Sequence, residues 1–154
     1  MTTIAGLPAH ALLVHAIVVL APLTALLEIL CGFWPAARRR LVWLVLALAV
    51  VTTVLTPITT DAGEWLLSQR RNQPSAILQA HAKLGDWMIY FSIALLVVAV
   101  GLAVLHWLEG RSDNRRVAAT AVVAVLALVV GVSSIVTVYR IGDSGAHSVW
   151  GGGG

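Results

Sequence analysis

Charged residues are scarce in this chain. Only 11% of its 154 residues are Asp, Glu, Lys or Arg, whereas 59% are hydrophobic. Soluble globular domains carry about 25% charged residues, so the composition argues against a soluble protein. No polar stretch is long enough to form a second domain, and we predict a single domain over residues 1–150. Residues 151–154 are all glycine and are interpreted as an added linker.

Cysteine and catalytic motifs are also scarce. The single Cys31 lies in an apolar run and has no disulfide partner within the chain. No Ser-His-Asp or metalloprotease spacing is present, which argues against hydrolysis, although enzymatic activity of another kind is left open. The net charge of +3 comes from arginines in short connections, without a basic face interleaved with aromatics, so we expect no nucleic-acid partner.

Long apolar runs make up most of the sequence. Four of them cover residues 11–30, 41–58, 87–107 and 117–138. Each is long enough to cross a bilayer core of about 30 Å as a helix that rises about 1.5 Å per residue. The sequence therefore predicts an all-α integral membrane protein, a four-helix bundle in contact with the lipid bilayer.

The basic residues predict the orientation of these helices. Six of the ten Lys and Arg residues lie in two short connections, at positions 38–40 and 111–116. Because short basic loops stay in the cytoplasm, both termini are expected outside. Tryptophans are expected in two interfacial belts, Trp34, Trp43 and Trp107 inside and Trp65, Trp87 and Trp150 outside.

Histidines gather at the predicted outer end. Four of the five, His10, His15, His81 and His147, fall there, together with Asp61, Glu64, Asp86 and Asp143. Imidazoles and carboxylates from separate helices suggest a cofactor or metal site. The five-residue step from His10 to His15 turns about 140° around a helix, so only one of them is expected to face a shared ligand.

A short internal repeat relates the two halves of the chain. The sequence Ala-His-Ala around His10 recurs around His81, and Asp61-Ala62-Gly63 resembles Asp143-Ser144-Gly145. A parallel repeat would place His10 opposite His81. The glycine-containing tail at 142–145 is expected to form a turn that folds back over the bundle.

A second polar pair is predicted in the inner half. Glu28 lies within hydrocarbon depth, and His106 lies at the inner end of the third segment. A bare carboxylate is costly there, so Glu28 is expected to be protonated or paired, most simply with His106.

Four stretches carry a family resemblance. They are residues 6–15 (GLPAHALLVH), 59–65 (TTDAGEW), 81–85 (HAKLG) and 139–145 (YRIGDSG). Together they resemble the bacterial membrane family catalogued as domain of unknown function 2231, over the chain up to Trp150. The resemblance implies a four-helix protein of the bacterial cytoplasmic membrane. Because some members are fused to Rieske-type or cytochrome domains, it also implies electron transfer near the outer face.

The leading hypothesis is a small redox protein that binds b-type haem near the outer face. Imidazoles from facing helices hold haem iron in bundle cytochromes, and an apolar core suits the macrocycle. We expect His15 and His81 as axial ligands, His10 as the substitute, and Arg140 beside the propionates. The partner would be a quinone or a Rieske- or cytochrome-type periplasmic carrier.

Two alternatives stay open. One is a zinc, iron or copper site whose candidate ligands are His10, His81, Asp61, Glu64 and His147. The other is a membrane scaffold without a cofactor, whose histidines are interfacial. An oligomer is compatible with each of these hypotheses.

The orientation can be tested by cysteine labelling in intact cells. Cysteines at Arg39 and Arg115 should resist a membrane-impermeant thiol reagent, whereas one at Gln73 should react, because only the latter is expected outside. Labelling of the first two but not of the third would refute the orientation.

Overall fold

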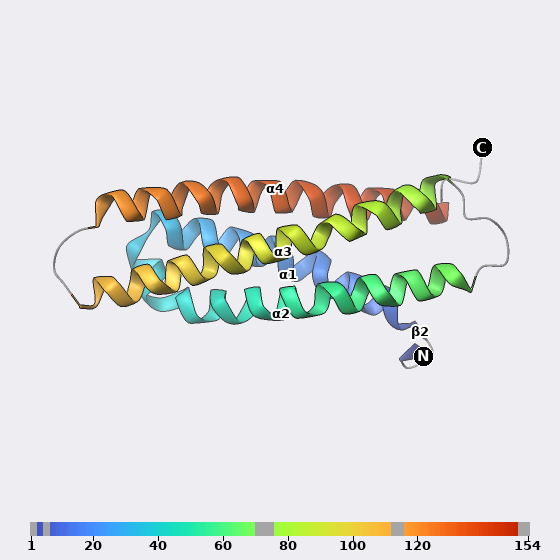
Figure 1. Ribbon diagram of the computed structural model, residues 1–154, viewed down its shortest axis with the longest axis horizontal. Helices are drawn as coiled ribbons and strands as arrows, with labels where there is room; N and C mark the ends of the chain where they lie inside the picture. The colour runs from blue at the N-terminus through green and yellow to red at the C-terminus, as the bar shows by residue number, and fades with distance from the viewer. Residues whose placement is uncertain (1–2, 5–6, 70–75, 112–115, 151–154) are drawn as a thin grey trace.

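Four long helices make up most of the molecule. The computed structural model describes the backbone of residues 3–4, 7–69, 76–111 and 116–150, and the side chains of residues 10, 12–69, 76, 79–111 and 116–147. Residues 151–154, interpreted above as a linker, lie outside the described residues. The helices are α1 (Ala9–Phe33), α2 (Pro35–Ser68), α3 (Ala76–Glu109) and α4 (Val117–Trp150), as Figure 1 shows.

The helices form a ring in which sequence neighbours pack side by side. α1 packs against α2 and α4, α3 packs against the same two helices, and α1 and α3 lie on a diagonal (Figure 1). We call the end where α1 and α3 begin the histidine end and the opposite end the arginine end. The predicted all-α four-helix bundle is confirmed. The small antiparallel pair of β1 (Thr3–Ile4) and β2 (Leu7–Pro8) before α1 was not predicted.

All four helices are long and apolar enough to cross a membrane. Large hydrophobic side chains lie exposed on the outside of each one, among them Val19, Leu44, Val97 and Val129. The interior instead holds many small residues, such as Ala21, Ala49, Ala99 and Ala127, each fully buried. Small residues inside and large apolar ones outside are typical of membrane bundles, because lipid accepts the large side chains while close packing holds the helices together.

Glycine brings α1 and α4 close together. A Cβ atom on Gly131 would lie 2.9 Å from Cδ1 of Ile29 and 3.3 Å from the carbonyl oxygen of Ala25. A Cβ atom on Gly32 would lie 3.0 Å from Cα of Ala124. Any larger residue at these two positions would push the helices apart, so the α1–α4 packing depends on them.

The helices extend well beyond the predicted apolar runs. α2, α3 and α4 each contain 34 residues, which corresponds to about 51 Å at 1.5 Å per residue, against a hydrocarbon core of about 30 Å. The additional turns of α2, α3 and α4 lie mainly at the histidine end. The prediction of a turn at 142–145 is wrong, because α4 stays helical to Trp150.

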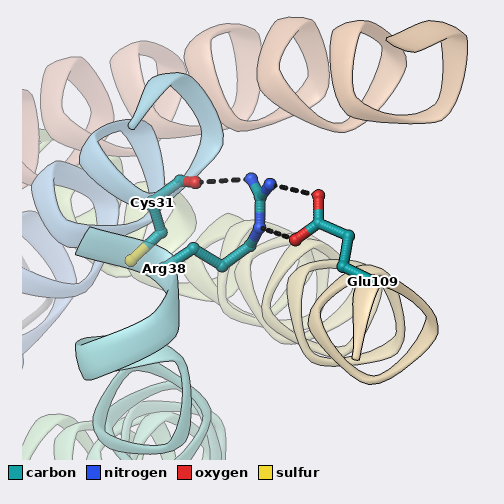
Figure 2. Close-up of polar contacts among 3 residues, drawn as sticks. All are labelled: Cys31, Arg38 and Glu109. Atoms are coloured by element: carbon teal, nitrogen blue, oxygen red, sulfur yellow. Dashed lines mark hydrogen bonds and ion pairs between the residues drawn. The ribbon is translucent and has the colours of Figure 1, made fainter. Parts of the chain in front are cut away.

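A fully buried arginine ties three helices together at the arginine end. Arg38 of α2 donates from Nη2 to Oε1 of Glu109 at 2.6 Å and from Nε to Oε2 at 3.3 Å, and so binds the carboxylate of α3 through two nitrogens. Its Nη1 donates to the carbonyl oxygen of Cys31 in α1 at 2.9 Å (Figure 2). The last turn of α1 thereby gains a partner for a carbonyl that the helix end leaves unbonded.

Removing the charge of Glu109 should destabilise the bundle. The Arg38 side chain is 0% exposed, so Glu109→Gln would leave a buried guanidinium without a countercharge, at a cost of about 3 kcal/mol. Unfolding in detergent, followed by circular dichroism, measures the loss. Asp61→Asn, at an exposed carboxylate, is the control and should change the stability by less than about 0.5 kcal/mol. Equal stabilities of the two variants would contradict a structural role for the ion pair.

Candidate functional site

A cavity of about 280 Å³ opens at the histidine end of the bundle, with residues from all four helices in its wall. The wall is mostly apolar and includes Val14, Ile17, Leu66, Met88 and Val138. The polar side chains in the lining are His10, Thr56, Thr59, Thr60, Glu64, His81 and Asp86. An apolar hollow with a few converging polar groups is typical of small-molecule and cofactor sites.

His10 is fixed by the backbone of α2. Its Nδ1 lies 2.9 Å from the carbonyl oxygen of Thr59. A carbonyl oxygen only accepts, so Nδ1 carries the proton, and Nε2 of the neutral ring retains its lone pair. The ring lies against Gly63, where a Cβ atom would come within 2.8 Å of Cε1 of His10.

His81 is held in the same tautomer by α4. Its Nδ1 lies 3.0 Å from Oγ of Ser144, and that hydroxyl donates to the carbonyl oxygen of Ile141 at 2.9 Å. Since the only hydroxyl proton is used toward Ile141, Ser144 accepts from Nδ1–H of His81. Nε2 of the neutral His81 ring therefore also retains its lone pair.

The two histidine positions repeat each other in space. His81 lies against Gly145, where a Cβ atom would be 3.1 Å from its Cε1, as His10 lies against Gly63. The hydrogen bonds of each histidine lead to a backbone carbonyl, that of Thr59 for His10 and that of Ile141, through Ser144, for His81. In both halves this carbonyl lies four residues before the glycine. The two imidazoles line one cavity and are close enough for charges on them to interact. This arrangement agrees with the predicted parallel repeat.

Such anchoring orients an imidazole for ligation. Metal-bound histidines almost always donate their second ring N–H to a carbonyl, carboxylate or water, which fixes the ring and its tautomer. Both His10 and His81 meet this requirement through Nδ1, and both leave Nε2 for a ligand. Sequence reasoning missed Thr59 and Ser144 as the groups that do this. The glycines of the repeated motif were the available signal, since they mark where each ring packs.

Other predicted site residues lie elsewhere. His15 is on an exposed side of α1 and is not part of the cavity wall, as the 140° step from His10 requires. Arg140 is exposed and also outside the wall, so it is not placed to meet propionates in this cavity. Of the expected residues, the structure brings together His10, His81, Glu64 and Asp86 in the cavity wall.

The five candidate metal ligands of the sequence analysis, which are His10, His81, Asp61, Glu64 and His147, do not all line the cavity. Asp61 is exposed and lies outside the cavity wall. His147 is exposed as well, with Nδ1 bonded to the carbonyl oxygen of Asp143, one turn earlier in α4, at 2.9 Å. Among the residues that the structure describes, no group of three or more His, Cys, Asp or Glu side chains converges on a point that could hold a metal ion.

The predicted pairing of Glu28 with His106 is wrong. Glu28 is fully buried, and neither carboxylate oxygen has a hydrogen-bond partner among the described residues. His106 instead lies edge-on to Trp43, with ring centroids 6.3 Å apart. Hydropathy predicts how deep each residue lies in the membrane. It does not predict which side of the helix the residue faces, and a side-chain contact depends on that. The other expectation from the sequence, that Glu28 is protonated, stays a prediction.

Alanine at either glycine should move the matching histidine. Gly63→Ala introduces a Cβ atom 2.8 Å from Cε1 of His10, so that ring must shift, whereas Gly145→Ala should displace His81. The imidazole signals of ¹⁵N-histidine-labelled protein, assigned with single His variants, report each displacement. Gly142→Ala is the matched control on α4, because a Cβ atom there meets nothing within 4 Å. A Gly63→Ala spectrum identical to that of the control would refute the packing of His10.

The sequence was compared with protein families, with curated proteins and with solved structures. The profile of the family described as "Predicted membrane protein (DUF2231)" matches residues 6–154. No curated protein and no solved structure matches the chain. The four apolar helices agree with the description of that family, and the match covers nearly the whole sequence. The chain therefore belongs to the predicted membrane protein family DUF2231.

Proposed function

We propose that the protein is a small membrane redox protein that binds b-type haem in the cavity at the histidine end, where His10 and His81 would hold the haem iron. The observation that carries the proposal is the pair of imidazoles in one cavity, each anchored through Nδ1 and each with Nε2 left for a ligand. His10 takes the place first assigned to His15, because His10 lines the cavity and His15 does not.

A haem fits this donor set better than a bare metal ion does. A structural zinc ion takes four protein ligands and a catalytic one takes three. Two imidazoles alone meet neither requirement, and no third ligand converges with them among the described residues. Haem iron needs only the two axial positions from the protein, because the macrocycle fills the other four. The apolar wall of Val14, Met88 and Val138 suits the flat hydrophobic ring.

When bound, haem b supplies a one-electron redox centre. The protein side chains would set its environment. The fixed tautomers present both imidazoles as neutral donors, and the apolar wall limits access of water. Glu64 and Asp86 add negative charge to the lining, which favours the more positive, oxidised state of a redox centre. Electron exchange with a quinone or a Rieske- or cytochrome-type carrier, on the outer side of a bacterial cytoplasmic membrane, completes the proposal.

Visible absorption of purified protein tests the ligand pair. Protein expressed with added haem precursor should show a Soret band, and reduction by dithionite should sharpen the α and β bands of a six-coordinate low-spin centre. His10→Ala and His81→Ala should each abolish or strongly change this spectrum. His15→Ala and His147→Ala are the matched controls and should keep it, because neither residue lines the cavity.

The same samples distinguish the alternatives. A colourless protein with stoichiometric zinc, iron or copper by elemental analysis would replace haem by a metal site. A colourless protein without metal would favour a scaffold. A normal haem spectrum in His10→Ala that is lost in His15→Ala would identify His15, and not His10, as the ligand on α1.

A further inference from the structure

A second and larger cavity lies at the arginine end. Its volume is about 1040 Å³, and residues from all four helices contribute to its wall. It is distinct from the histidine-end cavity, with which it shares no residue. Nothing in the proposed electron-transfer role uses it, so its occupant has to be inferred from its own chemistry.

The wall of this cavity carries a surplus of positive charge. Arg38 is neutralised by Glu109, but Arg39, Arg111 and Arg116 also line the cavity. Within the described parts of the chain, none of these three guanidinium groups pairs with a carboxylate. The guanidinium of Arg111 lies 3.6 Å from the ring centroid of Trp107, which limits its motion. Three guanidinium groups around one hollow favour an anion with several oxygens, such as a phosphate.

Apolar residues continue the cavity toward the middle of the bundle. Ala124 and Val125 are in the same wall as the arginines, about two turns from the start of α4. Trp43 and Trp107, both half exposed, mark the depth at which amphipathic rings meet lipid headgroups. The cavity thus combines a cationic rim at headgroup depth with an apolar wall at acyl-chain depth.

We propose that this cavity binds one anionic phospholipid. Its phosphate meets Arg39, Arg111 and Arg116, and an acyl chain lies along Ala124 and Val125. A basic pocket between transmembrane helices at an interface has the chemistry that recognises anionic headgroups. The proposal does not depend on haem, and either orientation of the protein in the membrane would allow it.

Native mass spectrometry of detergent-solubilised protein, titrated with dioleoyl phosphatidylglycerol, measures the binding. We expect one tightly retained lipid and, in Arg39→Gln or Arg116→Gln, roughly a tenfold loss of affinity for each charged contact removed. Arg40→Gln is the matched control. Arg40 is adjacent in sequence, exposed and equally charged, but it does not line the cavity, and its loss should change the affinity by less than about twofold.

Three results would overturn the proposal. They are equal retention of dioleoyl phosphatidylcholine, displacement of phosphatidylglycerol by millimolar inorganic phosphate, and an equal effect of Arg40→Gln and Arg39→Gln. The second would identify a small-anion site, and the third a general effect of loop charge. If a variant fails to fold, the wild-type protein gives the answer. Brominated phosphatidylglycerol should quench part of the fluorescence of the six tryptophans, because Trp43 and Trp107 line the cavity. Unlabelled phosphatidylglycerol, but not phosphatidylcholine, should reverse this quenching.

Discussion

The structure depends on one constraint, that backbone polar groups in hydrocarbon must be satisfied within the chain itself. Four long helices meet it along most of their length through their own backbone hydrogen bonds. Carbonyl and amide groups stay unbonded at the helix ends, and Pro22 and Pro57, which have no N–H to donate, each remove one backbone hydrogen bond inside α1 and α2. Polar side chains connect separate helices near both ends, and in the middle the hydroxyl of Thr53 in α2 donates to the carbonyl oxygen of Ser92 in α3 at 3.0 Å. Small buried residues such as Ala49 and Ala99 pack the rest of the middle.

The two ends meet this constraint with different chemistry. At the arginine end, the buried Arg38 joins a carboxylate of α3 to a terminal carbonyl of α1, so a charge is neutralised and a helix end is bonded at once. At the histidine end, the imidazoles of His10 and His81 bond to a backbone carbonyl of α2 and to the Ser144 hydroxyl of α4. The first arrangement holds the bundle together, and the second leaves two ring nitrogens for a ligand. A cofactor role is therefore proposed for the histidine end alone.

The repeat explains how two histidines in similar settings come to line one cavity. Each half contributes a histidine in the first two turns of one helix and a glycine near the end of the next. The imidazole ring of the histidine packs against that glycine. Placed around a common axis, the halves direct both rings to the same hollow. The correspondence is incomplete, since Thr59 bonds His10 directly through its carbonyl whereas Ser144 mediates the contact of His81 with the carbonyl of Ile141.

The sequence by itself determined the number of helices, their apolar character and the end at which the histidines gather, because hydropathy and residue spacing report depth along a helix. Only the tertiary structure decided which face each residue presents. It placed His10 in the cavity wall and His15, Arg140 and His147 outside it, and it left Glu28 without a hydrogen bond to His106. The physical reason is that lipid and protein interior are equally apolar, so the inner and outer faces of these helices have no contrast in hydrophobicity that a sequence pattern could reveal.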